Sequence, residues 1–275
     1  MWALNVRQTR EILAHLGACP NRKLGQNFLI NTNIAQNIAN SLSNNDIIVE
    51  IGPGKGALTK FLYERFSDNL FLIELDTNFI QDLSLCFPKT QIICRDVLQV
   101  DFEKLAEGKK INIIGNLPYC ISTEILFLIH KYRDCIDEVV CMLQKEVVDR
   151  ICAKNGCKQY GIPSVLLQSF FDVEKLFDVG PENFYPVPKV VSSVMRLKRN
   201  GVQKLNCDER LFDKVVHSSF RFRRKILKNC LGNIVNKNFE SDKLNLRAEQ
   251  LSVSDFIDLT NEIDFFCKQN LSEAE

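Results

Sequence analysis

Short apolar runs of strand length alternate with segments of helical spacing through the first 200 residues of the chain. These runs occupy residues 47–51, 70–75, 91–94, 111–115 and 138–143. Strands separated by helices pair in parallel, because only a long crossover brings the chain back beside its previous strand in the same direction. Right-handed crossovers place the carboxyl ends of all these strands on one rim of the sheet. The alternation therefore predicts a doubly wound α/β sheet whose functional side chains follow its strands.

The pattern becomes entirely helical toward the C-terminus. Helices are expected at residues 34–42, 57–66 and 161–171 and from residue 122, and a strand at 190–197 follows the proline-rich stretch 181–188. Residues 198–206 are polar, as in a linker. From Glu209 onward all spacing is helical, with one helix expected over 211–231 and another within 252–268. We therefore expect two domains, residues 1–200 and residues 201–275.

The composition is that of an average globular protein, with 45% hydrophobic and 25% charged residues. Disorder is therefore expected only at the ends. The formal net charge is only +1. Because no global field marks the chain as a partner of a polyanion, any nucleic-acid surface has to come from local clusters of Lys and Arg.

Eleven cysteines and three histidines raise the question of disulfides or a metal site. No cysteine pair has the C-x-x-C spacing, and Cys86, Cys94, Cys141 and Cys230 lie in apolar runs, where reduced cysteine behaves as a small hydrophobic residue. Residues 1–17 are charged, and no stretch approaches the roughly 18 apolar residues of a membrane span. We expect a cytoplasmic protein with reduced thiols, monomeric, with no metal and no membrane partner.

The tetrapeptide Asn116-Leu117-Pro118-Tyr119 follows the apolar run 111–115 and precedes a predicted helix. An Asn carboxamide oxygen accepts a hydrogen bond from an exocyclic amine, Pro fixes the turn, and Tyr offers a flat face to a base. The tetrapeptide is therefore a candidate catalytic loop for an aminated ring. The alternative is an ordinary strand-to-helix turn, since these residue types cluster in turns anyway.

A glycine-rich loop, Gly52-Pro53-Gly54-Lys55-Gly56, ends one predicted strand and opens the next helix. Glycines there let the backbone approach a ligand closely. The dinucleotide pattern G-x-G-x-x-G fails at its last position, where Ala57 and then Leu58 follow. Hydride chemistry with a nicotinamide is therefore not favoured.

Acidic residues stand at the ends of three successive predicted strands, at Glu50, Glu74 and Asp96. Glu74 lies about 20 residues beyond the glycine loop, where a carboxylate accepts hydrogen bonds from ribose hydroxyls. Asp96 suits an adenine amino group, although a helix N-cap or an ion pair with Arg95 is an alternative for it. Such a series favours a nucleoside with a positive sulfonium over one with phosphates, which carboxylates repel.

A basic stripe and an apolar stripe share the predicted helix 211–231. The basic stripe contains His217, Arg221, Arg224 and Lys228, and the apolar stripe contains Phe212, Val216, Phe220, Leu227 and Leu231. The stripe suits contact with RNA phosphates, as do Arg7, Arg10, Arg22 and Lys23 near the N-terminus. A charge run is more often only a solvated helix face, so the two interpretations stay open at this point.

Ordered motifs cover most of the chain. They are Gly25-Gln26-Asn27-Phe28-Leu29, Glu50-Ile51-Gly52-Pro53-Gly54, Ile73-Glu74-Leu75-Asp76, Asp96, Asn116-Leu117-Pro118-Tyr119, Leu143-Gln144-Lys145-Glu146-Val147, Phe184-Tyr185-Pro186-Val187-Pro188-Lys189-Val190, Phe220, Arg223-Arg224-Lys225 and Arg247-Ala248-Glu249. The ordered set resembles the ribosomal RNA adenine N6-dimethyltransferases, a family of S-adenosylmethionine-dependent enzymes. Two positions depart from the usual pattern, Cys120 after the tetrapeptide and Phe222 before the Arg-Arg-Lys run.

The resemblance implies a Rossmann-like class I methyltransferase fold, with a seven-stranded, mostly parallel sheet, helices on both faces and a small all-α C-terminal domain. It implies S-adenosylmethionine as cofactor, with Asn27 and Leu29 over the methionine end, Glu74 on the ribose and Asp96 on the adenine. The full implied cofactor set is Asn27, Leu29, Glu50, Gly52, Gly54, Glu74, Asp96 and Asn116.

For the target adenine, the resemblance implies that Asn116 and the Leu117 carbonyl accept from N6 while Tyr119 and Phe184 hold the faces of the ring. The alternative for Phe184 is a core aromatic beneath the proline-rich turn. The implied RNA contacts are Arg22, Lys23, Arg221, Arg223, Arg224, Lys225 and Lys228. Adenine deamination is disfavoured, because the H-x-E and P-C-x-x-C zinc arrangement is missing from the sequence.

The function implied is N6,N6-dimethylation of two adjacent adenosines in small-subunit ribosomal RNA, with that RNA or the assembling small subunit as partner. Two alternatives stay open. One is a large-subunit adenine methyltransferase that confers antibiotic resistance, which the Arg247-Ala248-Glu249 motif disfavours by resemblance. The other is a non-catalytic factor in ribosome assembly.

Overall fold

The computed structural model describes residues 26–43 and 46–272. The chain forms two compact units, the first extending to Val148 and including Val173–Arg199, the second comprising Asp149–Asp172 and the residues from Asn200 onward. Sequence patterning places one boundary near residue 200. The packing adds residues 149–172 to the C-terminal unit, where helix α8 (Ile162–Gln168) packs against α9 (Glu209–Phe220).

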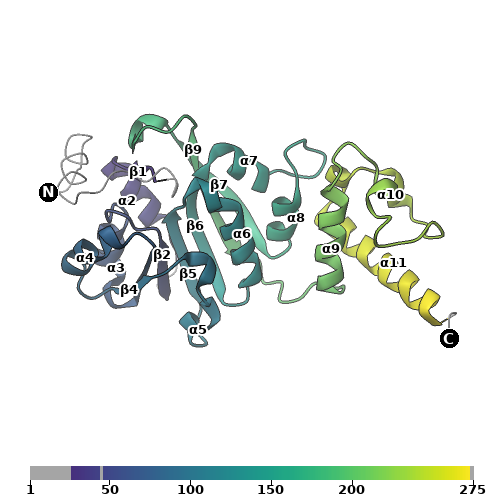
Figure 1. Ribbon diagram of the computed structural model, residues 1–275, viewed down its shortest axis with the longest axis horizontal. Coiled ribbons are helices and arrows are strands. Elements are labelled where there is room, and N and C mark those ends of the chain that lie inside the picture. The colour runs from purple at the N-terminus through teal and green to yellow at the C-terminus, as the bar shows by residue number, and fades with distance from the viewer. Residues whose placement is uncertain (1–25, 44–45, 273–275) are drawn as a thin grey trace. The chain divides into compact units, whose positions relative to one another are not determined.

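The first unit is built on a seven-stranded sheet with the order β4-β3-β2-β5-β6-β9-β7 (Figure 1). The strands are β2 (Ile47–Ile51), β3 (Leu70–Glu74), β4 (Gln91–Cys94), β5 (Ile111–Asn116), β6 (Ile136–Gln144), β7 (Phe171–Val179) and β9 (Ser192–Arg199). Strands β4 to β6 pair in parallel, and β9 pairs with β6 in the antiparallel sense. The predicted seven-stranded, mostly parallel sheet is confirmed.

Crossover direction reverses once in this sheet, between β2 and β5. From β2 the chain moves outward to β3 and β4, and it then returns across β2 to β5 and β6. Right-handed crossovers put helices of the two halves on opposite faces. Helices α3 (Thr59–Phe66) and α4 (Thr77–Cys86) therefore cover one face, and α5 (Phe102–Ala106) and α6 (Ser122–Lys131) cover the other. Ligands bind at such a reversal, beyond the carboxyl ends of the strands.

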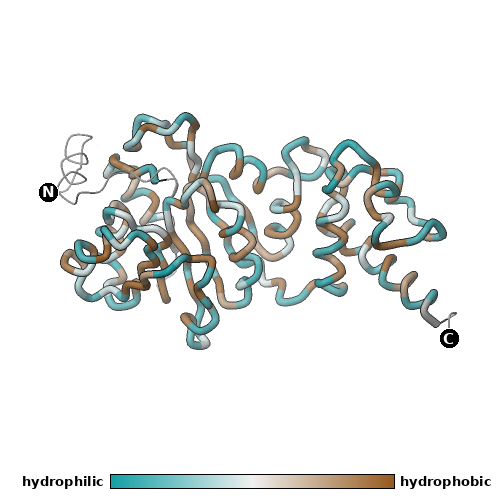
Figure 2. Tube along the Cα trace, in the orientation of Figure 1, coloured by the Kyte–Doolittle hydropathy of each residue, from teal (hydrophilic) through white to brown (hydrophobic). Residues whose placement is uncertain are grey.

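The central strands are buried along almost their whole length, which is why the sequence predicted them. All five residues of β2 and the first five of β5 are buried, because parallel strands with helices on both faces are covered twice. Figure 2 shows the consequence as hydrophobic colour along the strands and hydrophilic colour along many of the connecting loops. The remaining helices of the structure are α2 (Thr32–Asn40), α7 (Lys145–Ile151), α10 (Leu227–Cys230) and α11 (Val253–Ser272).

Strand β7 is a correction to the sequence prediction. The expected helix 161–171 ends at Gln168, and a strand begins at Phe171. Charged residues alternate with apolar ones at the start of β7, where Asp172 and Glu174 follow Phe171 and Val173. This strand lies at the edge of the sheet, and only two of its nine residues are fully buried, so its apolar signal is weak.

The predicted helix 211–231 is also wrong, because it is broken after Phe220. Residues 221–225 form turns, and α10 starts at Leu227. Tertiary contacts hold the break open: Ile226 forms a β-bridge with Arg247, and the Leu227 amide donates to the Leu246 carbonyl. The predicted basic stripe therefore does not run along one helix. The predicted apolar set is nevertheless buried, with Phe212, Val216, Phe220, Leu227 and Leu231 all in the core.

The cysteines divide into two groups. Cys141 and Cys230 are buried as expected, whereas Cys86 and Cys94 are exposed, so the prediction for these two is wrong. Cys94 ends the edge strand β4, whose side chains are only partly covered. The ten cysteines in the part of the chain that the structure describes are all free thiols. No helix among residues 26–43 and 46–272 has the length and apolar character needed to cross a bilayer.

Gly115 lets β5 approach β2 at the reversal point. A Cβ added at Gly115 would lie 2.6 Å from the Ile51 carbonyl oxygen, a backbone atom that cannot swing away. We predict that Gly115→Ala lowers the free energy of unfolding by roughly 2–3 kcal/mol, measured by urea denaturation and circular dichroism. The control is Gly232→Ala, where an added Cβ meets nothing within 4 Å. Equal stability of the Gly115 variant and the parent would contradict this packing.

Candidate active site

A cavity of about 300 Å³ lies beyond the carboxyl ends of β2, β3, β4 and β5. It is lined by the loops that follow these strands and by the segment Gln26–Leu29. The structure brings the whole predicted cofactor set to this one cavity, namely Asn27, Leu29, Glu50, Gly52, Gly54, Glu74, Asp96 and Asn116. Its volume is at the lower end of the range for small-molecule sites.

The glycine loop forms the floor of the cavity beside β2. Gly52 and Gly54 both have positive φ, +67° and +51°, which side chains disfavour. A Cβ at Gly54 would lie 3.2 Å from the Phe28 ring, whereas a Cβ at Gly52 meets nothing within 4 Å and would project into open space. The backbone at Gly52 is therefore accessible to a ligand in the cavity.

Glu74 connects the end of β3 to the glycine loop. Its carboxylate accepts from the Gly54 amide at 2.9 Å through Oε2 and from the Asp76 amide at 2.8 Å through Oε1. Burial raises the pKa of Glu74, and the backbone hydrogen bonds oppose that rise. Each oxygen keeps a second lone pair. Glu74 is thus fixed in place and still able to accept from hydroxyl groups of a ligand.

Glu50 is almost completely buried, with 1% of its surface exposed. The Thr59 hydroxyl donates to its Oε2 at 2.7 Å. Burial raises the pKa of Glu50 to about 8, the Thr59 hydrogen bond acts in the opposite direction, and the charge of Glu74 raises the pKa further. Near neutral pH this carboxyl group is therefore mostly protonated, and a cation in the cavity would favour its ionised form.

Asp96 acts as a helix N-cap, which was the alternative considered for it, and it also lines the cavity. Its Oδ1 accepts from the Leu98 amide at 2.9 Å and caps the short 3₁₀ helix Val97–Gln99. The ion pair with Arg95 is not formed. Because the cap uses one oxygen, Oδ2 is left to accept from a group in the cavity.

The Asn116 side chain is oriented by a single hydrogen bond. Its Nδ2 donates to the Asn27 carbonyl at 2.9 Å, and only the amino end of a carboxamide can do so. Leu117 is anchored next to it, since its amide donates to the Met142 carbonyl of β6 at 3.1 Å. Among the described residues, none donates to Asn116 Oδ1 or to the Leu117 carbonyl. The tetrapeptide therefore offers two adjacent unused acceptors.

Tyr119 is held from two sides. Its backbone lies in the 3₁₀ turn Tyr119–Ile121 after Pro118, which lines the cavity, and its hydroxyl forms a 2.7 Å hydrogen bond with the Ser192 hydroxyl. Burial raises the pKa of Tyr119, and Ser192 opposes that rise. Ser192 is fully buried at the start of β9. Sequence reasoning missed Ser192, although its place eight residues after Phe184 in the same motif region is visible in the sequence.

Phe184 does not join the cavity. It belongs to β8 (Phe184–Tyr185), which pairs with β1 (Phe28–Leu29), and its side chain has 0% exposure in the hydrophobic core. The alternative of a core aromatic describes this structure. Strands β1 and β8 are further joined through Asn183, which accepts from the Ile30 amide and from the Asn31 side chain. A base can stack on Phe184 only if this two-stranded ribbon moves.

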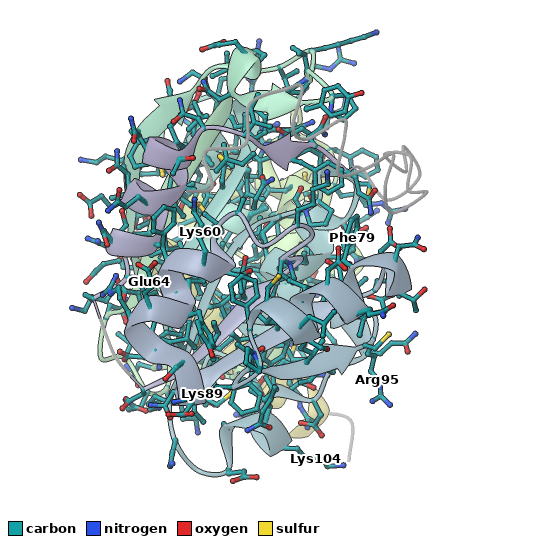
Figure 3. The ribbon with its side chains drawn as sticks, turned by 90° about the vertical axis from the view of Figure 1, so that its left-hand side faces the viewer. Lys60, Glu64, Phe79, Lys89, Arg95 and Lys104 are labelled. Carbon is teal, nitrogen blue, oxygen red and sulfur yellow. The ribbon has the colours of Figure 1, made fainter. Side chains whose placement is uncertain are left out.

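Several further residues line the cavity and were not predicted, among them Lys55, Leu75 and Arg95. Burial lowers the pKa of Lys55 to about 8, and its Nζ lies 5.4 Å from the centre of the Phe28 ring. Leu75, at 50% exposure directly after Glu74, offers an apolar surface. Phe28 packs edge-on against Phe79, 5.7 Å away. In Figure 3, Phe79 and Arg95 lie on one side of the view and Lys60 on the other.

None of the predicted RNA contacts in the part of the chain that the structure describes lines this cavity. The second unit holds five of them, Arg221, Arg223, Arg224, Lys225 and Lys228, and all five are exposed. Arg223 is anchored, since its guanidinium donates to the carbonyls of Lys158 at 2.7 Å and Tyr160 at 2.9 Å. Arg7, Arg10, Arg22 and Lys23 lie outside the described residues. The described part of the chain contains no group of three or more potential metal ligands.

Residues 19–264 match the family model of the ribosomal RNA adenine dimethylases. Among curated proteins, the ribosomal RNA small subunit methyltransferase A of Cytophaga hutchinsonii is 47% identical over 247 residues, which cover 87% of this chain and 95% of that protein. The protein of the same name from Flavobacterium johnsoniae is 45% identical over 249 residues, covering 88% of this chain and 95% of the relative.

Among solved structures, a dimethyladenosine transferase from Plasmodium falciparum superposes with a TM-score of 0.72 at 24% identity, covering 85% of this chain and 96% of that chain. The 23S rRNA methyltransferase ErmE gives a TM-score of 0.63 at 21% identity, covering 86% and 100%. These two likenesses establish the Rossmann-like methyltransferase fold. The family model and the curated relatives confirm the expected family: the chain belongs to the ribosomal RNA adenine dimethylases.

Proposed function

We propose that the protein transfers methyl groups from S-adenosylmethionine to N6 of two adjacent adenosines in small-subunit ribosomal RNA. Family membership and the names of the relatives support the reaction and the substrate. The observation that carries the proposal is the pair of unused acceptors, Asn116 Oδ1 and the Leu117 carbonyl, at the edge of a cavity lined by three carboxylates. That pair matches an exocyclic amine, which has two protons to donate.

The cavity residues fit S-adenosylmethionine. Open space at Gly52 accepts a ligand against the backbone, and the three carboxylates that line the cavity suit a cationic nucleoside. In this proposal Glu74 holds the ribose hydroxyls, Asp96 Oδ2 accepts from the adenine amino group, and Asn27 and Leu29 cover the methionine end, beside Gly54, Glu50 and Asn116. The bound cofactor supplies a methyl group on positively charged sulfur.

The tetrapeptide acts by orientation. The lone pair of adenine N6 is delocalised into the ring, so N6 is a poor nucleophile. Asn116 Oδ1 and the Leu117 carbonyl would accept hydrogen bonds from its two N–H groups and favour the pyramidal, nucleophilic geometry, which stabilises the transition state more than the ground state. After transfer, the methylated and positively charged N6 loses its surplus proton. Transfer from a cation to a neutral amine creates no separated charges, so positioning dominates and no strong base is needed.

Target-base binding is assigned to Tyr119 and Phe184. Tyr119, fixed by Pro118 and by the hydrogen bond between its hydroxyl and Ser192, would supply one ring face. Phe184 would supply the second face after the β1–β8 ribbon shifts. A stacked aromatic face contributes roughly 1–3 kcal/mol toward the cost of unstacking the base. A monomethylated N6 keeps a lone pair and one proton, so a pocket roomy enough to accept it would permit a second transfer with one of the two acceptors engaged.

RNA contact is assigned to the second unit through Arg221, Arg223, Arg224, Lys225 and Lys228, together with Arg22 and Lys23. Folded RNA would be recognised largely by its shape. We place the reaction in the cytoplasm, on a monomeric protein, with the ribosomal RNA or the assembling small subunit as substrate. Action on large-subunit RNA and a purely structural role in assembly are the competing functions, and the fit of the cavity to a nucleoside disfavours the second.

Given labelled S-adenosylmethionine and unmodified small ribosomal subunits, the protein should yield N6,N6-dimethyladenosine at two adjacent positions, located by mass spectrometry. Asn116→Ala should bind the cofactor more weakly and transfer roughly 100-fold more slowly, since one oriented polar group in an active site has an effect of that size. Asn270→Ala, which removes an exposed amide on α11, is the control and should match the parent.

Two results would count against this account. Label found only in large-subunit RNA would replace the proposed substrate, and undiminished transfer by Asn116→Ala would remove the role given to its amide.

The Tyr119–Ser192 hydrogen bond generates a second prediction. Tyr119→Phe keeps the ring but loses the hydroxyl, and Ser192→Ala loses the partner; each should lower kcat/KM for RNA roughly fivefold to tenfold because the ring becomes less fixed. The double variant should be no worse than either single one, since both remove the same bond. Ser193→Ala, which removes a hydroxyl that donates to Asp178, is the matched control and should add to Tyr119→Phe. Additive losses for Tyr119 and Ser192 would show that this bond does not position the ring.

The raised pKa of Glu50 makes cofactor affinity dependent on pH. Below about 8 the empty site holds Glu50 mostly protonated, and a bound sulfonium favours the ionised form, so binding releases a proton. Affinity for S-adenosylmethionine should therefore rise with pH by up to about tenfold per unit and level off above the pKa. Calorimetry in buffers of different ionisation enthalpy measures this proton release.

Two comparisons isolate Glu50 in that measurement. Uncharged-sulfur S-adenosylhomocysteine should show a weaker dependence, and Glu50→Gln should remove most of it. Lys55 also has a pKa of about 8 in the cavity, so Lys55→Gln is the control. If the pH dependence of cofactor affinity is lost in Lys55→Gln and persists in Glu50→Gln, the titrating group is Lys55, which would contradict the role given to Glu50.

A further inference from the structure

Phe222 is an exposed aromatic ring within the most basic stretch of the chain. Half of its surface, 50%, is accessible. No acidic residue occurs between Asp213 and Glu240, a stretch that contains seven Lys and Arg residues. The function proposed above uses the cations of this stretch but leaves the ring without a role.

The turn that carries Phe222 is held on both sides. The Arg221 guanidinium lies 5.4 Å from the centre of the Phe222 ring. On the other side, Arg223 is clamped to two backbone carbonyls of the same unit, and the Lys225 amide closes the turn by donating to the Phe222 carbonyl at 2.8 Å. The ring therefore projects from a rigid backbone and not from a loose loop.

Exposure alone does not single out this residue, because isolated exposed apolar side chains are common. Phe265 on α11 is even more exposed, at 65%, but residues 248–267 around it contain no Lys or Arg. Phe222 differs in its surroundings, since exposed Arg221, Arg224 and Lys225 flank it. A flat apolar face among cations matches an unstacked base and its neighbouring phosphates.

We propose that Phe222 stacks on an unpaired base of the RNA substrate while the adjacent cations contact its phosphates. The proposal rests on the proposed function, because it takes RNA as the ligand. Arg223 then has a positioning role, fixing the turn, whereas Arg224, Lys225 and Lys228 are left to meet phosphates. The ring would add affinity for single-stranded or looped RNA that depends little on salt, since stacking displaces few counterions.

The test measures binding of deproteinised small-subunit ribosomal RNA across a range of salt concentrations. Phe222→Ala should weaken binding about tenfold and leave the slope of affinity against salt unchanged. Phe222→Leu should behave like Phe222→Ala, because it keeps apolar bulk but no ring, and Phe222→Trp should bind like the parent. Arg224→Ala should instead reduce the salt slope by about one phosphate contact. Phe265→Ala is the matched control and should leave binding unchanged.

A direct signal for stacking comes from a Phe222→Trp variant in a Trp2→Phe background, which then has a single tryptophan. Its fluorescence should be quenched by the RNA, and equally by a short unpaired oligoadenylate at higher concentration. Parental binding by Phe222→Ala, or rescue by leucine, would overturn stacking. A defect seen only with protein-containing subunits would assign the ring to a ribosomal protein, and one seen only with phosphatidylserine vesicles would assign it to a membrane; both outcomes reject the proposal.

Failure of this proposal is separable from failure of the proposed function. At saturating subunits, Phe222→Ala should retain the parental kcat with a raised KM and unchanged cofactor affinity, because the residue lies in the second unit and lines no part of the cavity. If the parent protein itself transfers no methyl group to small subunits, the proposed function fails whatever Phe222 does.

Discussion

The close approach of β5 to β2 places the two central loops of the cavity side by side. Crossover direction reverses between these two strands, and Gly115 allows the β5 backbone to pass against the Ile51 carbonyl. The glycine loop leaves β2 at this point and the Asn116 tetrapeptide leaves β5 beside it. One contact without a side chain thus brings together the loop assigned to the cofactor and the loop assigned to the target base.

The polar groups around this contact divide into fixed and available halves. Glu74 and Asp96 each accept a hydrogen bond from a backbone amide, and the amino group of Asn116 donates to the Asn27 carbonyl. The remaining lone pairs belong to side chains that line the cavity and are already held in place, which lowers the reorganisation needed when ligands bind. Glu50 is expected to become negatively charged when a cation binds, since burial raises its pKa and keeps it largely neutral in the empty cavity. Orientation and electrostatics therefore suffice for the proposed chemistry without a dedicated base.

Much of this was legible in the sequence, for physical reasons. Strands β2 and β5 are buried on both faces, so each appears in the sequence as a continuous apolar run. The site residues follow the strands directly, and the parallel topology alone brings them to one rim of the sheet. The sequence did not predict edge strand β7, because several of its side chains are exposed to solvent and its apolar pattern is weak. It did not predict the helix break after Phe220 either, because that break depends on contacts with residues distant in sequence, such as Arg247. Phe184 and Ser192 show the same limit. The pairing of β1 with β8 decides that Phe184 lies in the core and not against a ligand. The position of β9 decides that Ser192 bonds to Tyr119. Neither is encoded in a local sequence pattern.

A crystal structure of the protein with S-adenosylhomocysteine and adenosine tests the central claim most directly. The account predicts the cofactor product in the cavity, with its ribose hydroxyls on Glu74 and its adenine amino group at Asp96. It also predicts the adenosine N6 within hydrogen-bonding distance of both Asn116 Oδ1 and the Leu117 carbonyl. A nucleoside amine that instead meets a carboxylate, or a cofactor bound away from the β2–β5 reversal, would contradict it.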